Sequence, residues 1–415
     1  MNIPNTISSI FFFSNNKSIN FLNLLIFIFP ISIITGPFLP DLILSIIALI
    51  GLILFILRKI KISFYFEFII LWIFYFIIII SSLLSEKILF SLDYSLFYFR
   101  FIVFAHFFVF LIINHKNLLK NFLFGLIISI SLLNLFSVFE LINFFYFSSD
   151  IDAVRRLHLP FSDEEIVGSF LIRILPIYIF MIYLNKNLLN SILFKFFNIF
   201  LILTSIITII FSGERTAILL LLFSVLFLGI VLLRINLKIF FMTIFTLIIL
   251  VSSLIIFDKK ISDRILQDYD RNISTNPEIN PYFNFSLVSF KMFEDKPFFG
   301  QGPKMFRKLC NNSKFNDHFD NCNMHPHSIY AQLLGETGIF AFLLVFFSFL
   351  YLVYKNFINF IIKNFDFSFS LATIAFIINF FPLVPSGNFF NNWINSLYYL
   401  SIILLIYHRV LKKNY

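Results

Sequence analysis

Long apolar stretches without charge alternate with short polar connectors along most of this chain. They lie near residues 20–36, 38–57, 64–84, 96–114, 121–143, 166–184, 193–211, 216–233, 239–257, 335–354, 367–385 and 392–408. Each is close to the roughly 20 residues that cross the hydrocarbon layer as a helix. The pattern therefore predicts an all-α polytopic membrane protein with about twelve transmembrane helices. The first stretch lacks a small-residue cleavage site, so we interpret it as a retained span.

The composition agrees with a membrane environment. Of the 415 residues, 60% are hydrophobic and 13% are charged, whereas a soluble domain carries about 25% charged residues. A chain this apolar needs membrane lipids as its solvent.

The net charge of +9 is carried largely by the short connectors. Its basic residues there are Arg58, Lys59, Lys61, Lys116, Lys120, Lys186, Arg234, Lys238, Lys355, Lys363, Arg409, Lys412 and Lys413. If the helices alternate in direction, all of these lie on one side, as the positive-inside rule requires of the cytoplasmic side. Both termini are then cytoplasmic, and nucleic acid is an unnecessary partner.

Two connectors on the opposite side are longer and more polar than the others. The first is about 144–165, and the second is about 258–334, which holds both cysteines. The chain thus divides into a bundle of nine helices at 1–257, a large outside loop at 258–334 and three helices at 335–415. A transporter of similar span number would distribute polar residues through the bundle, whereas here they gather outside.

The densest polar cluster runs from Asp317 to Ser328 and leads into an apolar run. The imidazole of His327 can exchange protons near neutral pH, so it can deprotonate a hydroxyl or stabilise a charged leaving group. A histidine that only caps local structure is the alternative. A divalent-metal site is a further alternative, less favoured because no paired spacing brings its ligands together. Its candidate ligands would be Asp317, His318, Asp320, His325 and His327.

Arginines form a second set of candidates. Arg215 lies in a very short outside turn, Ser212 to Thr216, where a guanidinium can bind phosphate oxygens in a bidentate manner. Pairing with Glu214 or contact with lipid headgroups is the alternative. Arg100 and Arg173 interrupt apolar runs, and we expect structural pairing for both, with Asp163, Glu164 or Glu165 as candidate partners of Arg173.

The cysteines, Cys310 and Cys322, are both in the large outside loop. In an oxidising compartment two nearby thiols form a disulfide, which would close this small loop and stiffen the segment before His327. A nucleophilic free thiol is the poorer interpretation.

The stretch from His325 to Gly338 resembles the signature of the O-antigen ligase and polymerase superfamily, with His327, Ser328 and Gly338 at the characteristic places. Phe299 to Arg307 is similar to the family's Gly-x-Gly-Pro segment, through Gly300, Gly302 and Pro303. The turn at Arg215 looks like the family's short outside arginine turn. Pro160 to Gly168 is similar to another segment seen in members.

The resemblance implies a membrane glycosyltransferase of the GT-C type at the outer face of the bacterial inner membrane, with no cofactor and no metal. The donor would be a glycan on undecaprenyl diphosphate, and the acceptor a sugar hydroxyl of lipid A-core or of another glycan. Ligation and repeat-unit polymerisation share this donor chemistry, with a slight preference for ligation. A transporter or flippase is the alternative outside this class.

The resemblance also implies residue roles. His327 and Arg215 would be catalytic, and the glycines with the cysteine pair would be structural. Ligases carry a second arginine upstream of the Gly-x-Gly segment, where this chain has Tyr282, with Arg264 and Arg271 further back. Arg307 or Lys304 would supply the missing charge. The residues expected to bind substrate are Arg307, Lys304, His325, Ser328 and Arg156, and those expected to be structural are Gly300, Gly302, Gly338, Cys310 and Cys322.

Overall fold

The computed structural model describes residues 16–60, 65–147, 156–161, 164–238, 240–241, 244–245, 280–316, 322–361 and 365–413. All regular secondary structure in these ranges is helical. The helices are α1 (Asn16–Ile33), α2 (Phe38–Ile56), α3 (Phe66–Leu83), α4 (Ile88–Ser95), η2 (Leu96–Tyr98), α5 (Phe99–Asn114), α6 (Lys116–Phe147), α7 (Val167–Leu184), η3 (Lys186–Asn190), α8 (Ile192–Phe211), α9 (Arg215–Ile235), α12 (Pro281–Asp295), α13 (Phe306–Leu309), α14 (Ile329–Ile361), α15 (Phe367–Asn379) and α16 (Asn392–Lys413).

The helical, multi-pass character of the chain is confirmed. Within the described ranges, eight helices are long and apolar enough to cross a membrane, and three shorter apolar helices lie at Asn20–Ile33, Arg215–Gly229 and Phe367–Asn379. Most of the ninth predicted span, 239–257, lies outside the described residues, as do 258–279 and 317–321 of the large loop. The total of twelve spans therefore stays a prediction.

Two span boundaries differ from those predicted. The fourth span continues back through η2 and α4, so that its helices begin at Ile88 rather than near residue 96. Helix α14 begins at Ile329, inside the predicted loop, and its helical geometry breaks at Gly338, where φ is 73° and ψ is −172°. The apolar pattern shows where a helix enters lipid, but it does not show a helical turn outside the membrane.

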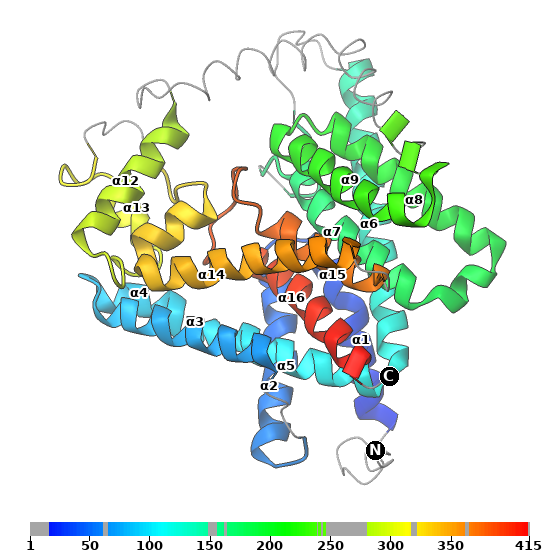
Figure 1. Ribbon diagram of the computed structural model, residues 1–415, viewed down its shortest axis with the longest axis horizontal. Coiled ribbons are helices and arrows are strands. Elements are labelled where there is room, and N and C mark those ends of the chain that lie inside the picture. The colour runs from blue at the N-terminus through cyan, green and yellow to red at the C-terminus, as the bar shows by residue number, and fades with distance from the viewer. Residues whose placement is uncertain are drawn as a thin grey trace.

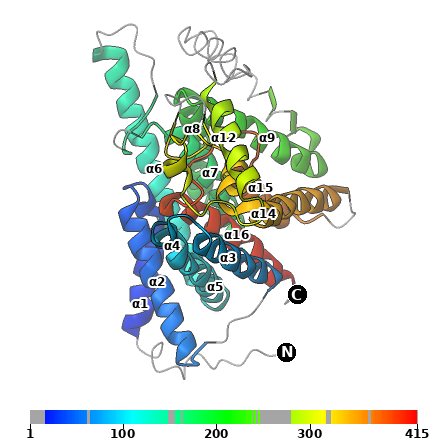
Figure 2. The ribbon, with the colours of Figure 1, turned by 90° about the vertical axis from the view of Figure 1, so that its left-hand side faces the viewer.

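The helices place two groups of candidate residues on either side of one connection. In Figure 1, α12 and α13 lie above α3 and α4 on one side, whereas α8 and α9 lie on the other. Helix α14 extends from beneath α12 across the middle, and Figure 2 shows the same stacking from the side. The connection from α15 to α16 rises between the two groups (Figure 1).

Buried serines join the helices beneath α12. Ser82 Oγ lies 2.7 Å from Ser95 Oγ and accepts a hydrogen bond from Ser91 Oγ at 2.9 Å. Ser81 Oγ donates to the backbone oxygen of Glu336 at 2.9 Å, which joins α3 to α14. Small polar side chains of this kind allow helices to approach closely in a membrane while keeping their own polar atoms bonded.

The arginines inside apolar runs have structural partners, in one case a different one from that expected. Arg100 forms an ion pair with Asp41 at 2.7 Å, as predicted. Arg173 donates to the backbone oxygen of Ser169 at 2.7 Å. Glu165, an expected partner of Arg173, lies 3.4 Å from Arg156 instead. The guanidinium of Arg173 reaches a carbonyl one helical turn away, because it is buried within α7.

Candidate functional site

Two sequence motifs meet where the Gly-x-Gly-Pro segment lies against α14. The backbone N–H of Gln301 donates to Gly335 O at 3.1 Å, and that of Gly302 donates to Glu336 O at 2.7 Å. On the other side of the kink, the N–H of Ile339 donates to Pro297 O at 2.9 Å. We call residues 297–307 together with 322–339 the platform. Its backbone groups satisfy one another where α14 is interrupted.

Two glycines make this close approach possible. Gly300 has φ of 65°, and a Cβ there would lie 2.4 Å from the backbone carbon of Glu336. Gly338 has φ of 73°, and a Cβ there would lie 2.3 Å from Phe298 O. Only glycine combines this backbone conformation with no side-chain volume. The two motifs are thus sterically dependent on each other.

Glu336 is the buried centre of the platform. Its side chain is fully buried, and its carboxylate accepts from Lys304 N, Phe306 N and Gln332 Nε2, each at 2.9 Å. Sequence reasoning missed this role. The available signal was a single acid at the start of an apolar run, where an uncompensated charge is costly.

Cations of the platform lie beside Glu336. Lys304 has φ of 61°, and its Nζ lies 3.8 Å from the ring centre of Tyr94. The pKa of Lys304 is lowered to about 8, mainly by burial and also by the Arg307 charge, while the Glu336 charge opposes both. The Nε of Arg307 is buried and has no hydrogen-bond partner among the described residues. Arg307 and Lys304 therefore form a partly desolvated cationic pair.

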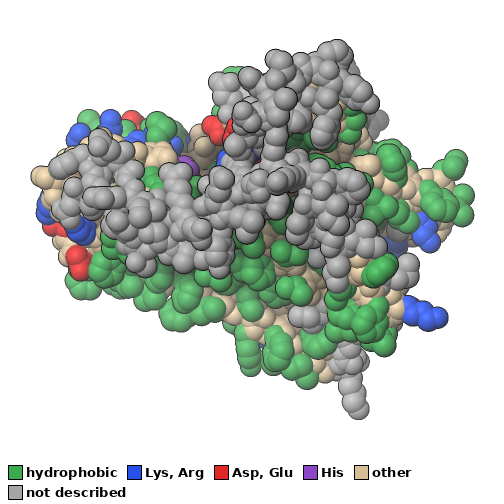
Figure 3. Space-filling view, turned by 90° about the horizontal axis from the view of Figure 1, so that it is seen from above, with side chains coloured by type: hydrophobic (Ala, Val, Ile, Leu, Met, Phe, Trp, Pro, Cys, Tyr) green, Lys and Arg blue, Asp and Glu red, His purple; other side chains and the backbone are tan. Residues whose placement is uncertain are grey.

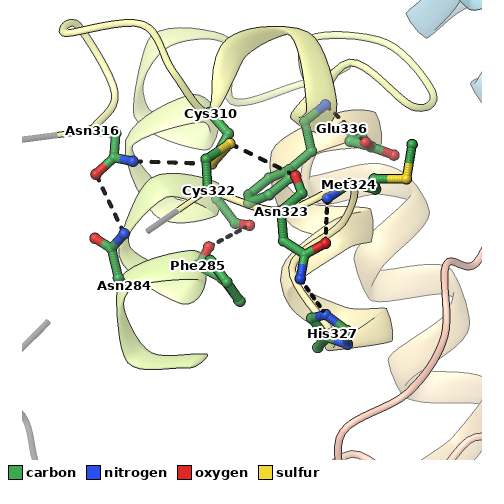
Figure 4. The surroundings of a disulfide bond; sticks show 11 residues. Asn284, Phe285, Cys310, Asn316, Cys322, Asn323, Met324, His327 and Glu336 are labelled. Carbon is green, nitrogen blue, oxygen red and sulfur yellow. Dashed lines mark hydrogen bonds between the residues drawn. A yellow bond between two sulfur atoms is a disulfide. The ribbon is translucent and has the colours of Figure 1, made fainter. Parts of the chain in front are cut away.

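His327 lies at the edge of this platform, with its ring held on several sides. Its Nε2 is 3.0 Å from the side-chain nitrogen of Asn323, as Figure 4 shows. The rings of Tyr282 and Phe285 lie 5.6 and 5.9 Å from the His327 ring, centre to centre. The backbone oxygen of His327 accepts from Ser386 N at 2.8 Å. Burial lowers the pKa of His327, so the neutral ring is favoured near pH 7.

The neighbours of His327 in sequence have different environments. The His325 ring centre is 4.1 Å from that of His327, and its Nε2 is buried without a partner among the described residues. The pKa of His325 is lowered to about 3, mainly by burial and also by His327 and Arg307, while a hydrogen bond with the Ser386 backbone opposes this. Ser328 accepts from Ala331 N at 3.3 Å and so caps the start of α14.

A disulfide holds the segment before His327. Cys310 and Cys322 are bonded, which agrees with the prediction from their shared loop. Cys310 is fully buried at the end of α13. Figure 4 shows the bond with Phe285 nearby. Cys310 packs in a small apolar core formed with Phe285, Val288, Met292, Met305, Phe306, Leu309 and Phe315.

The arginine turn, residues 212–216, is built around a second buried glutamate. The Glu214 carboxylate accepts from Gly168 N at 2.5 Å and from Ser169 N at 3.1 Å. These are orphan N–H groups of the first turn of α7, where an acid is favoured by the helix dipole. Glu214 thereby fixes where α9 begins, and Arg215 is the first residue of that helix.

The outside segment at 156–161 packs on the same turn. Leu157 N donates to Ser212 O at 3.1 Å, and the Glu140 carboxylate accepts from His158 Nδ1 at 2.7 Å. Burial raises the pKa of Glu214 to about 6, and hydrogen bonds from the first turn of α7 and the Arg156 charge oppose the rise. Arg156 therefore lies close to the turn, although its ion pair is with Glu165.

The connection between α15 and α16 contacts both regions. Gln332 donates to Asn388 Oδ1 at 3.1 Å and accepts from Phe389 N at 2.8 Å, next to Glu336. Trp393, at the start of α16, stacks on Phe170 of α7 with ring centres 5.8 Å apart. The His327 platform and the arginine turn are thus joined through one buried connection.

Charge is distributed unevenly on the face that carries these segments. Viewed from above, Lys and Arg side chains gather at the end formed by α12, α13 and α4, and histidine surface is visible nearer the centre (Figure 3). Among the described residues, no group of three or more His, Cys, Asp or Glu side chains forms a metal site. Asp317, His318 and Asp320, the other candidate ligands, lie outside the described residues.

The platform offers a neutral imidazole, His327, and a cationic pair, Arg307 and Lys304, whose charge reaches the neighbouring His325. Such a set can accept a proton from a hydroxyl and stabilise a phosphate leaving group.

Comparison with curated proteins finds no match. Residues 200–346 match the O-antigen ligase family model, and this range contains Arg215, the Gly-x-Gly-Pro segment and His327. The family match indicates glycan transfer of the O-antigen ligase type. This match, over residues 200–346, supports membership of the O-antigen ligase superfamily.

Proposed function

We propose that this protein transfers a glycan from undecaprenyl diphosphate to a sugar hydroxyl of lipid A-core, at the periplasmic face of the bacterial inner membrane. The observation that carries the proposal is the platform. It holds the neutral His327 ring next to His325, on which the charge of Arg307 acts, within the part of the chain that matches the ligase family.

In the proposed reaction, the acceptor oxygen bonds to the anomeric carbon as the bond from that carbon to the diphosphate oxygen breaks. The hydroxyl proton passes to His327, which acts as general base. Undecaprenyl diphosphate leaves with the bonding electrons. Its added charge is stabilised by Arg215, with Arg307 in place of the family's second arginine and Lys304 beside it.

The remaining candidates have supporting roles in this proposal. His325 and Arg156 line the approach to the base and to the arginine turn, respectively, and Ser328 caps the start of α14 directly after His327. Because charge neutralisation is assigned to side chains of the chain, the proposal requires neither metal nor cofactor. Both termini lie in the cytoplasm, which places both outside segments in the periplasm.

Deletion of the gene, followed by an electrophoretic lipopolysaccharide profile, tests the proposal. Complementation with His327→Ala or Arg215→Ala should lower glycan capping by about 10²-fold or more, because a general base or a diphosphate clamp contributes at least that much. Lys308→Ala is the matched control, since this cation is exposed on α13 with its Nζ 5.0 Å from the Phe90 ring centre.

The amount of each variant in the membrane fraction, measured by immunoblot, separates lost chemistry from lost folding. Accumulation of lipid-linked polymer with uncapped core supports ligation. Core that carries a single repeat would instead identify a polymerase. Normal capping by either alanine variant at normal abundance contradicts the proposed site, and loss of transfer in chelator contradicts metal independence.

A further inference from the structure

The side-chain amide of Asn323 is held between a backbone donor and the His327 ring. Its Oδ1 accepts from Met324 N at 2.6 Å, and its Nδ2 lies 3.0 Å from His327 Nε2; Figure 4 shows both contacts. A backbone N–H can only donate, so the amide oxygen must face Met324. The amide NH₂ must therefore face the imidazole. The backbone thus fixes which way this amide points, a choice that is often left open.

This orientation has a consequence for the ring. The NH₂ group of Asn323 has only hydrogens to offer, so Nε2 must present a lone pair to accept the bond. In the neutral ring the single proton then resides on Nδ1. A ring protonated on both nitrogens would point an N–H at the NH₂ group, and this contact would be lost.

We propose that Asn323 is a positioning residue that selects the Nδ1–H tautomer of His327 and keeps its Nε2 unprotonated, ready to receive the acceptor's proton. The proposal rests on the proposed role of His327 as the base. Asn323 Nδ2 occupies the position from which a sugar hydroxyl would donate to Nε2, so the acceptor takes its place when it binds.

The other described groups around the ring are neutral. His325 lies beside it in the same segment, Tyr282 faces it from α12, and the connection before α16 contributes the Ser386 N–H to the His327 backbone. Arg307 acts on the adjacent His325. None of these supplies a carboxylate that would stabilise a protonated ring, and burial also lowers the pKa of His327.

The disulfide explains how an exposed asparagine can hold this position. Cys322 immediately precedes Asn323, and its partner Cys310 is fully buried in the core beneath α12. The disulfide therefore anchors the backbone one residue before Asn323. The hydrogen bond from Met324 N to Asn323 Oδ1 then fixes the orientation of the Asn323 side chain. Asn323 thus reaches the ring from a fixed backbone and not from a freely moving loop end.

The test replaces the amide by groups that differ in hydrogen-bonding capacity. Asn323→Asp introduces an acceptor, which favours an N–H on Nε2, so the acid limb of the pH profile of transfer should move to higher pH by on the order of one unit. Asn323→Ala should shift it less and lower kcat. Asn312→Asp is the matched control, because it adds the same charge at an exposed site whose oxygen accepts from Lys314 N.

A direct measurement separates this proposal from the proposed function. In ¹⁵N-histidine-labelled full-length protein, the His327 signal, identified by its loss in His327→Ala, should report the Nδ1–H tautomer in the native chain and a mixture in Asn323→Ala. An unchanged tautomer, or equal profile shifts in Asn323→Asp and Asn312→Asp, overturns the role of Asn323. Full transfer by His327→Ala would instead refute the catalytic assignment on which it rests.

Discussion

The platform that carries His327 and the turn that carries Arg215 are each built around a buried glutamate. In the platform the Glu336 carboxylate accepts backbone N–H groups of the Gly-x-Gly-Pro segment, and in the turn Glu214 accepts those at the start of α7. They differ in what else holds them together. The platform adds a disulfide and a contact between two backbones, whereas the turn adds hydrogen bonds, nearby charges and a close approach of Gly168 to the Ser212 side chain.

This difference suggests separate demands on the two regions. A base must be within hydrogen-bond reach of its proton, so small displacements of His327 would be costly. A guanidinium that neutralises a diphosphate works through charge and tolerates more variation in position. In the proposed function, the sterically and covalently fixed region holds the base, His327, and the region fixed by charge and hydrogen bonds holds the cation, Arg215.

The largest effect should come from breaking the backbone contact of the platform. Gly338→Ala would place a Cβ 2.3 Å from Phe298 O at a φ of 73°, so we expect loss of most of the folded protein. Gly168→Ala tests the close approach at the arginine turn. Its new Cβ would meet mainly the Ser212 side chain, so less of the folded protein should be lost. Gly36→Ala is the control, because its φ is also positive but nothing lies within 4 Å.

Size-exclusion profiles of detergent-solubilised protein measure this series. Equal losses in Gly338→Ala and Gly36→Ala would show that backbone conformation, and not the contact with Phe298, requires glycine at position 338.

Much of the helical framework could be predicted from the sequence, because lipid requires long apolar helices. The glycines, the cysteine pair and His327 could be recognised from their spacing. The roles of Glu336 and Asn323 could not be predicted. The partners of Glu336 are set when segments distant in sequence meet, and the contact of Asn323 depends on the direction in which its side chain turns. Arg173 shows the same limit, because nearby acids in sequence suggested an ion pair that a closer carbonyl replaces.

An intermediate effect should follow from removing the disulfide. Its loop spans a sequence separation of 12, so Cys310→Ala with Cys322→Ala should lower the free energy of unfolding by about 2–3 kcal/mol. Thermal unfolding in detergent measures the loss. Because the chain has only these two cysteines, reductant should destabilise the native protein to the level of the double variant and leave that variant unchanged. Destabilisation of the double variant by reductant would contradict this assignment.

The smallest expected effect concerns the arginine turn. Glu214 should make the free energy of unfolding depend on pH. Burial raises the pKa of Glu214 from 4.5 to about 6. Between these values the folded protein retains a proton that the unfolded chain has released, so stability falls as pH rises through this window. The expected fall is on the order of 2 kcal/mol. Above pH 6 the cost of the buried charge is fully present.

Glu214→Gln should remove this slope, because its side chain does not titrate. It also turns an NH₂ group towards a backbone N–H at the start of α7, which should cost about 1–3 kcal/mol at every pH. Glu164→Gln is the control, because Glu164 is an exposed carboxylate of the outside segment 144–165. This variant should keep the native pH dependence of stability. Thermal unfolding of the native protein, Glu214→Gln and Glu164→Gln at pH 4.5 and pH 6.5 measures both the pH dependence and the loss of stability that is present at every pH. If Glu214→Gln retains the native slope, the turn does not depend on a buried ionised carboxylate, and the contrast with the platform would rest on the disulfide and the glycines alone.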